Sequence, residues 1–191
     1  MASTAKPDPE YAPPPPKAEP SGLLSTVNCS VIDVALRVLL FASTLTSIIV
    51  LVTSKQTVRA PLPLQAKFQH TPAFIYFLVA LSVSGLYGLI TTLASISIIK
   101  KPEFSTKYWL FFVLGDVLIL GILASATGTA GGIAYLGLKG NDHVRWQKVC
   151  NVFDKFCRHI GGSIAVSLFA SVLLVLLVFL SIFSIHKRIP K

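Results

Sequence analysis

The chain has 191 residues, of which 53% are hydrophobic and only 13% are charged, and its formal net charge is +9 at pH 7. A soluble domain carries about 25% charged residues, so this composition excludes an ordinary soluble globular protein. The positive charge does not indicate a nucleic-acid partner, because the basic residues mostly flank apolar stretches, where they can reach lipid headgroups. We therefore expect a protein whose main partner is the lipid bilayer.

The N-terminal part of the chain, residues 1–30, precedes the first long apolar stretch. Seven of the twelve prolines fall within its first 22 residues. A segment of this kind has too little apolar material to form a core, and it is predicted to be a disordered, Pro-rich cytosolic tail. A short basic tail, residues 186–191, is predicted at the other end of the chain.

Four apolar stretches lie between the two tails. They cover residues 31–52, 74–99, 108–138 and 164–185. Each is at least as long as the roughly 20 residues that an α-helix needs to cross a bilayer. The connecting loops are too short for a second globular domain. The sequence therefore predicts an all-α, integral membrane four-helix bundle as one domain over residues 31–185.

Four spans place both termini on the same side of the membrane. The two sides carry equal numbers of Lys and Arg residues, but residues 100–107 and the C-terminal tail carry theirs directly beside the bilayer. The positive-inside rule acts most strongly there, so both termini are predicted to be cytosolic. The Asn28-Cys29-Ser30 sequence is a glycosylation sequon, and a glycan on Asn28 would indicate the opposite orientation.

Three charged residues lie inside predicted spans: Asp33 in the first turn of the first span, and Arg37 and Asp116 at greater depth. At helical rise, Arg37 is about 9 Å into the first span and Asp116 about 12 Å into the third, which runs in the same direction. An ion pair between them would remove much of the cost of burying each charge. Two alternatives stay open. Arg37 could pair locally with Asp33, or Asp116 could serve an ion or proton site in a small channel or transporter.

The third span is rich in small residues that recur every four positions. Rows of this kind let another helix approach closely, and we predict that they pack the bundle around the third span. The spacing does not distinguish a helix of the same chain from one of another subunit. The predicted helix-packing residues are Gly121, Ala124, Ser125, Gly128 and Gly132.

The connection at residues 139–160 carries two cysteines. In a continuous helix the Cα atoms of Cys150 and Cys157 would be about 10 Å apart, beyond the roughly 7 Å that a disulfide spans. A disulfide between them therefore requires a turn, and an exoplasmic loop provides the oxidising environment. A metal site with His143 and His159 is the alternative, although the spacing matches no familiar zinc pattern.

No catalytic motif is present. The chain lacks HExxH, P-loop and GxSxG patterns, and its three Glu residues lie in the N-terminal tail and a short loop. We expect no enzymatic activity, cofactor or resident metal.

Several short segments together resemble the plant Casparian strip membrane domain protein family, the CASP-like proteins, which are related to MARVEL-type four-helix proteins. The matching segments cover residues 31–185. They are Arg37, Phe68-Gln69, Gly115-Asp116, Ala124–Tyr135, Lys139-Gly140-Asn141, Trp146, the Cys150–Cys157 spacing with Phe153 and Phe156, and Gly162. The founding members carry an aromatic-containing signature in the first exoplasmic loop. Residues 53–71 lack it, so the resemblance is to the CASP-like proteins rather than to those founders.

The resemblance implies an oligomerising scaffold in the plasma membrane with cytosolic termini. An Arg in the first span and an Asp in the third are hallmarks of that family, and they match Arg37 and Asp116. Family members form homo- and hetero-oligomers, and the founders recruit cell-wall machinery. On this basis, Asn141 and Trp146 are expected to contact partners such as secreted cell-wall enzymes. A small ion channel that uses Asp116 is the alternative function.

Overall fold

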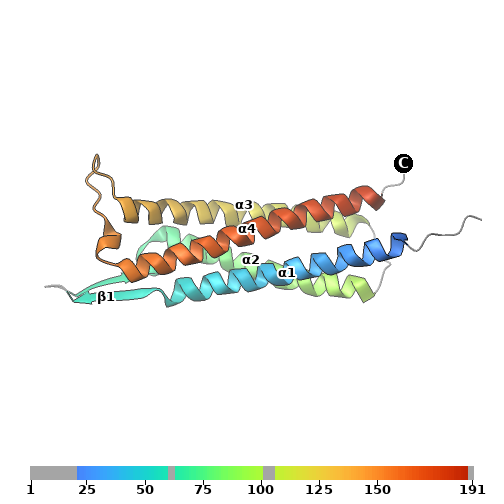
Figure 1. The fold of residues 1–191 in the computed structure, drawn as a ribbon, viewed down its shortest axis with the longest axis horizontal. Helices are drawn as coiled ribbons and strands as arrows, with labels where there is room; N and C mark the ends of the chain where they lie inside the picture. Colours follow the sequence, from blue (N-terminus) through green and yellow to red (C-terminus); the bar gives the residue numbers. More distant parts are fainter. Residues whose placement is uncertain (1–20, 60–62, 101–105, 189–191) are drawn as a thin grey trace, which may run out of the picture.

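Four long helices lie side by side in the computed structural model, which describes residues 21–59, 63–100 and 106–188 (Figure 1). They are α1 (Ser21–Thr53), α2 (Pro72–Lys100), α3 (Thr106–Lys139) and α4 (Asp154–Arg188). Each contains a stretch long and apolar enough to cross a membrane. These stretches are Val31–Thr53, Pro72–Ser97, Leu110–Lys139 and Asp154–Ser184. The predicted all-α, four-span architecture is confirmed.

Two helices begin ten residues earlier than the sequence predicts. Helix α1 begins at Ser21, so the last ten residues of the predicted disordered tail are helical. Helix α4 begins at Asp154, within the segment predicted to be a loop. The thickness of the bilayer sets the length of an apolar stretch, but the helix that contains it can extend into the headgroup layer. Residues 1–20 and 189–191 of the two predicted tails lie outside the described residues.

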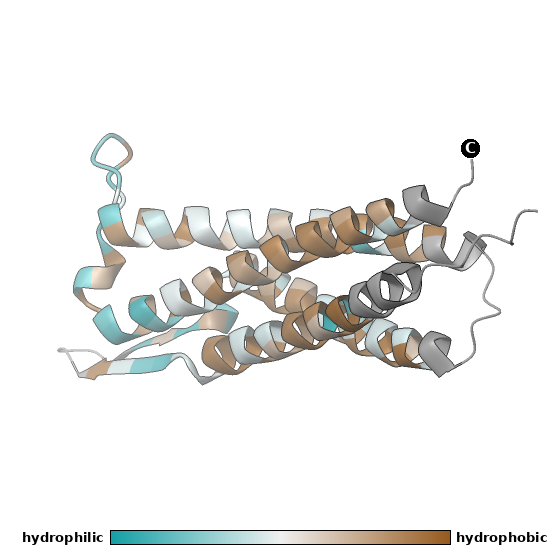
Figure 2. Cartoon of the chain, turned by 45° about the vertical axis from the view of Figure 1, so that its right-hand side comes forward, coloured by the Kyte–Doolittle hydropathy of each residue, from teal (hydrophilic) through white to brown (hydrophobic). Residues whose placement is uncertain are grey.

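The helices form a closed bundle. Helix α1 packs against α2 and α4, and α3 packs against the same two helices. The middle of the bundle is predominantly hydrophobic, and hydrophilic residues gather at one end (Figure 2). Large apolar side chains also cover the outside, as expected for helices that face lipid. The buried hydrophobic core includes Leu40, Leu51, Phe77, Leu81, Leu123, Ala126, Ala130, Ile160, Ala170, Leu174 and Leu177.

A β-hairpin occupies most of the connection between α1 and α2, which the sequence predicted only as a polar loop. Strand β1 (Lys55–Arg59) pairs antiparallel with β2 (Pro63–Lys67), and a short 3-10 helix, η1 (Phe68–His70), follows. Pro63 is the first residue of its strand, a position that tolerates proline because no ladder hydrogen bond is lost. The side-chain oxygen of Gln56 accepts a hydrogen bond of 2.9 Å from the backbone N–H of Phe156. The hairpin thereby caps one of the free N–H groups at the start of α4.

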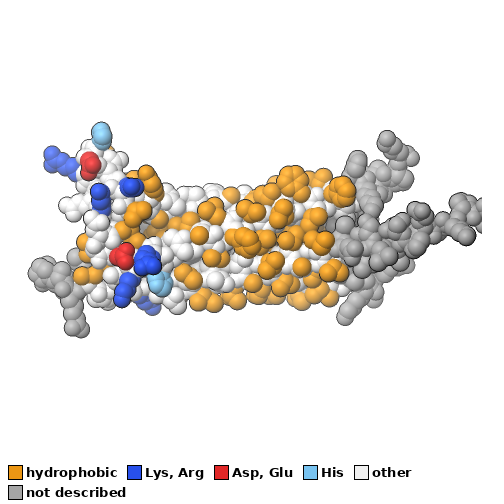
Figure 3. Space-filling view, in the orientation of Figure 1, with side chains coloured by type: hydrophobic (Ala, Val, Ile, Leu, Met, Phe, Trp, Pro, Cys, Tyr) orange, Lys and Arg blue, Asp and Glu red, His pale blue; other side chains and the backbone are white. Residues whose placement is uncertain are grey.

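Among the described residues, charged side chains gather at one end of the bundle. We call the end with the β-hairpin and the α3–α4 connection the hairpin end, and the end where α1 begins and α4 finishes the terminal end. On the face drawn in Figure 3, the described Lys, Arg, Asp and His side chains gather at the hairpin end, and hydrophobic side chains spread along the helices. This distribution agrees with a bilayer around the middle of the bundle and a headgroup layer at the hairpin end.

Hydroxyl groups join the helices inside the bundle. Each of Ser47 and Ser163 donates to the other's backbone carbonyl at 2.9 Å, which links α1 to α4. The hydroxyls of Thr127 and Ser167 lie 2.7 Å apart and link α3 to α4. All four side chains are buried. Such bonds satisfy polar groups that would otherwise be costly in a water-free core.

Candidate functional site: a buried ion-pair cluster and a disulfide-bonded loop

Arg37 and Asp116 meet in the half of the bundle nearer the terminal end. Helix α1 carries Arg37 and helix α3 carries Asp116. The guanidinium Nη1 and Nη2 atoms donate to the two carboxylate oxygens at 3.2 and 3.1 Å, so the pair is bidentate. Arg37 is only 1% exposed and Asp116 is fully buried. A bidentate Arg–carboxylate pair fixes geometry as well as charge, and it holds α1 against α3 across the bundle.

Asp33 joins the same cluster. The Nε atom of Arg37 donates to Asp33 Oδ2 at 3.1 Å. The hydroxyl of Ser95, on α2, donates to the same oxygen at 3.1 Å. The interhelical pair and the local pair that the sequence left as alternatives therefore coexist in the structure. Two carboxylates share one guanidinium, so the three side chains carry a formal charge of −1.

Tyr87, like Ser95, is a cluster residue that the sequence did not reveal. Its hydroxyl donates to Asp116 Oδ1 at 2.7 Å and also lies 3.2 Å from the carbonyl oxygen of Phe112. This approach needs a glycine at position 115, because a Cβ atom there would lie 2.6 Å from the Tyr87 hydroxyl. The ring of Phe112 lies beneath the guanidinium carbon, with 5.2 Å between that carbon and the ring centroid. The available signal was a tyrosine hydroxyl in the middle of a span without charged residues.

The cluster is built as an interhelical lock. It takes groups from α1, α2 and α3, and the charges compensate one another where water is excluded. Both oxygens of Asp116 accept hydrogen bonds from protein groups. Within the described residues, no group of three or more His, Cys, Asp or Glu side chains is arranged to hold a metal ion. The chemistry present is charge neutralisation and helix pairing.

The small residues of α3 are not where we predicted them. The expectation that they pack this chain's bundle is wrong, because all five lie on the exposed side of α3. A Cβ atom added at Gly121, Gly128 or Gly132 would meet nothing within 4 Å. Ser125 alone of the five accepts a hydrogen bond across helices, a long one of 3.5 Å from Tyr76.

A second row of α3 faces inward instead. The spacing of small residues is the same on both sides of this helix, so the sequence pattern could not reveal which side faces the core. Contact with another subunit remains a prediction for the outer row. The inward residues are Leu123, Ala126, Thr127 and Ala130.

The α3–α4 connection is closed by a disulfide. Cys150 lies in the 3-10 helix η2 (Val149–Asn151), and Cys157 lies in the first turns of α4. Their Cα atoms are 5.7 Å apart and the sulfurs are bonded, as predicted. The chain turns between η2 and Asp154, and this turn brings the two cysteines within bonding distance. Because both sulfurs are used, they are not free to bind metal with His143 and His159 as in the alternative.

Asn141 and Trp146 close a tight turn beyond α3. Each backbone N–H donates to the other's carbonyl oxygen, at 3.0 and 2.9 Å. The Asn141 side chain also accepts a hydrogen bond from the backbone N–H of His143 at 3.1 Å. Trp146 is 55% exposed, with exposed Val144 beside it. The predicted contact residues thus lie on an ordered turn that presents an aromatic side chain.

Replacing Gly140 by Ala is expected to destabilise this turn by about 1–3 kcal/mol. Gly140 has φ = +69°, and a Cβ atom there would lie 2.7 Å from the carbonyl oxygen of Trp146. Gly137→Ala is the matched control, because its Cβ would be in ordinary contact, 3.7 Å from the sulfur of Cys150. Thermal unfolding and protease cleavage of the loop measure the effect. Equal behaviour of the two variants would contradict the assigned turn geometry.

The fold and the cluster define a class of protein. The chain is a four-span membrane protein in which a buried Arg–Asp pair joins the first and third spans and a disulfide closes the loop before the fourth. The family model of the Casparian strip membrane protein domain matches residues 26–173. The chain therefore belongs to the plant CASP-like family, and the resemblance seen in the sequence is confirmed.

Full-length relatives give the same result. The chain is 59% identical over 200 residues to CASP-like protein 1D1 of Populus trichocarpa and 58% identical over 198 residues to CASP-like protein 1D2 of Glycine max, with all of each chain covered. It is 53% identical to CASP-like protein 1D2 of Arabidopsis thaliana over 93% of this chain and 95% of that relative. No solved structure matches the chain significantly.

Proposed function

We propose that this protein is an oligomerising scaffold of the plasma membrane that organises a membrane domain and has no enzymatic activity. The observation that carries the proposal is the open row of small residues on α3. In a bilayer, helices associate where small residues let their backbones approach, because lipid provides no hydrophobic driving force. The partners are further copies of this chain and related family members, in agreement with what the family resemblance implies.

The buried cluster supports this role better than a channel. An ion pathway requires polar groups that an ion can reach along a path through the membrane. Asp116 is fully buried, and Arg37 and Tyr87 occupy its oxygens. The cluster instead stabilises the relative positions of α1, α2 and α3. A rigid bundle of this kind presents the outer face of α3 at a constant orientation.

The hairpin end is the surface that we assign to partners outside the cell. With both termini cytosolic, the turn at Asn141–Trp146 lies on the wall side of the membrane. Its exposed Trp146 supplies an amphipathic aromatic surface of the kind that is enriched at protein interfaces. Secreted cell-wall-modifying enzymes are the proposed partners, and mass spectrometry of proteins that copurify with the tagged protein tests this assignment.

Self-association is tested with a bulky residue in the open row. Gly128→Leu is expected to reduce oligomers at least several-fold and to speed fluorescence recovery of the tagged protein in plant plasma membrane. The control is Gly162→Leu on α4, which also places its side chain where a Cβ meets nothing within 4 Å. Crosslinking and single-molecule photobleaching count the subunits. Free diffusion of the unmodified protein as a monomer would refute the scaffold proposal.

The proposed orientation predicts no glycan on Asn28. Asn28 lies in α1, and its side chain is outside the described residues. With a cytosolic N-terminus, the sequon does not meet the glycosylation machinery. Endoglycosidase treatment is expected to leave gel mobility unchanged, and an antibody should reach a C-terminal tag only after the membrane is permeabilised. A glycan on Asn28 would invert the topology.

A further inference from the structure

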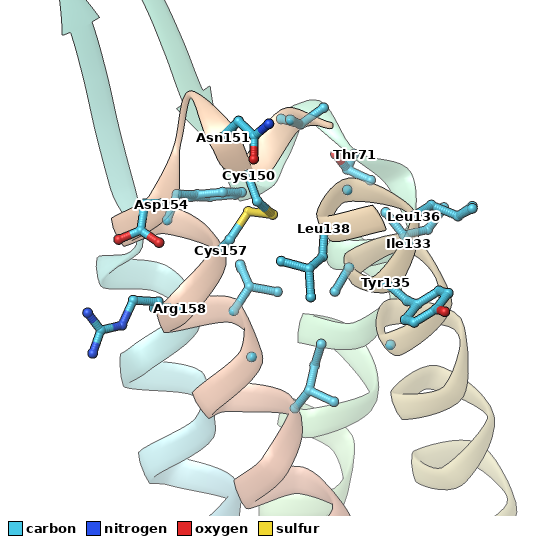
Figure 4. Close-up of a pocket in the computed structure, with 18 of the residues that line it drawn as sticks. Thr71, Ile133, Tyr135, Leu136, Leu138, Cys150, Asn151, Asp154, Cys157 and Arg158 are labelled. Atoms are coloured by element: carbon cyan, nitrogen blue, oxygen red, sulfur yellow. A yellow bond between two sulfur atoms is a disulfide. The ribbon is translucent and has the colours of Figure 1, made fainter. Parts of the chain in front are cut away.

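A cavity of about 920 Å³ lies at the hairpin end, between the last turns of α3 and the first turns of α4 (Figure 4). This volume is at the upper end of the range for small-molecule sites. The Cys150–Cys157 disulfide lies at its upper side, and Leu138 and Ile133 project from α3 at its wall. Neither the buried cluster nor the open row of α3 contributes to this feature.

The cavity exists because small residues line parts of both helices. Gly131, Ala134 and Gly137 line it from α3, and Gly161 lines it from α4. A Cβ atom at Gly161 would meet nothing within 4 Å. The rest of the lining is mainly apolar, including Phe74, Ile160 and Ile164. An open hollow of this composition accommodates an apolar chain.

The position of the cavity indicates the source of that hydrocarbon chain. The lining residues between Gly131 and Leu138 and between Gly161 and Ile164 lie inside stretches that span the membrane. These residues are mainly apolar, and lipid chains are the apolar material available around a bundle that spans a membrane. Polar residues line the cavity only toward the hairpin end, where a headgroup would lie. They are Thr71, Arg145, Gln147, Asn151, Asp154 and Arg158.

The charge at this end selects the headgroup. The connections at residues 53–73 and 139–160 contain eight Lys and Arg residues and two Asp residues. Two of the basic residues, Arg145 and Arg158, also line the cavity. Asp154 also lines it, and Figure 4 shows Asp154 and Arg158 on the side of α4 away from α3, with Asp154 nearer the strands. Basic side chains in this position attract anionic headgroups.

We propose that this cavity binds one chain of a membrane lipid with an anionic headgroup. The hydrocarbon chain of the lipid lies between α3 and α4, and its headgroup lies beside Arg145 and Arg158. The disulfide holds the upper side of the cavity in place by fixing η2 to the start of α4. This proposal goes beyond the scaffold function and does not depend on the oligomeric state.

Trp146 lines the cavity and is a built-in probe. The chain has one other tryptophan, Trp109, so a Trp109→Phe background leaves Trp146 as the only indole. The protein is reconstituted in phosphatidylcholine bilayers that contain a small fraction of either phosphatidylglycerol or phosphatidylcholine with brominated chains. The brominated phosphatidylglycerol is expected to quench Trp146 at least twofold more strongly than the brominated phosphatidylcholine.

Neighbouring glycines give the matched control for the cavity. Gly161→Phe fills the hollow and should abolish the difference between the two lipids. Gly162→Phe leaves the difference intact, because a Cβ there also meets nothing within 4 Å but Gly162 does not line the cavity. Ala134→Phe is a second filling variant in case Gly161→Phe fails to fold. Equal quenching in the filled and control variants would overturn the proposal.

Two charge variants test the headgroup. Arg158→Gln should reduce the preference for the anionic lipid more than Lys155→Gln, which removes the same charge from the same helix but does not line the cavity. Equal losses would mean that the general surface charge attracts the lipid, and this would overturn the assigned headgroup site. Glycerol phosphate, which has the anionic group without the chain, should not compete. Competition by glycerol phosphate would overturn the part of the proposal that assigns the chain to the cavity.

Discussion

Asp116→Ala is expected to destabilise the folded bundle by about 3–5 kcal/mol, the usual cost of removing one partner from a buried ion pair. The substitution leaves the two Nη groups of Arg37 without their acceptors. Arg37 is 1% exposed, so water does not replace the lost carboxylate. Thermal unfolding of the purified protein in detergent measures the effect, with an expected decrease of the midpoint on the order of 10 °C.

The geometry also predicts an order of effects within the cluster. Arg37→Met should be the most damaging single change, because it leaves both Asp33 and Asp116 without a cation. Asp33→Asn should be the mildest, because the Asp33 side chain is 11% exposed and Asn retains one side-chain oxygen as an acceptor. Replacing all three residues by Asn, Met and Leu should recover much of the stability. An Asp116→Ala protein with an unchanged midpoint would refute the lock.

Loss of the disulfide is expected to cost about 2.5 kcal/mol, the loop-closure entropy for a separation of seven residues. The variant is Cys150→Ser with Cys157→Ser. The damage should be confined to the hairpin end, because the buried cluster lies in the other half of the bundle. Thermal unfolding and limited proteolysis of the α3–α4 connection measure it.

Reduction provides an independent comparison for the disulfide. A reducing agent should lower the midpoint of the unmodified protein by the same amount and leave the double variant unchanged. Cys29→Ser is the control, because neither cysteine of the disulfide is altered. A double variant as stable and as protease-resistant as the unmodified protein would show that the bond does not hold the loop in place.

Much of this fold could be predicted because the bilayer imposes a simple constraint on sequence. Four apolar stretches and two charges at matching depth were sufficient to predict the spans and to place Arg37 near Asp116. The contacts of Tyr87 and Ser95 could not be predicted. They depend on how each helix is rotated about its own axis. Because these helices carry apolar residues on all sides, the sequence pattern does not show which side faces the core.

The outer row of α3 illustrates the same limit. Small residues four positions apart occur both at Ala126 and Ala130 and at Gly128 and Gly132. In water, the hydrophobic side of a helix would be the buried side, but in a bilayer both sides can be apolar. The hairpin was missed for another reason. Pro61 and Pro63 indicate a loop, and an edge strand that begins at a proline gives the same local signal.

The reciprocal bonds between Ser47 and Ser163 join the first and last helices of the chain, and this has a consequence for biosynthesis. Helix α4 also supplies Ala170, Leu174 and Leu177 to the core. During translation the first three helices therefore enter the membrane before α4, which packs against both α1 and α3, has been made. The ring of helices can close only after the ribosome has completed residue 177. Until then, α4 does not cover the side of α1 against which it packs in the folded protein.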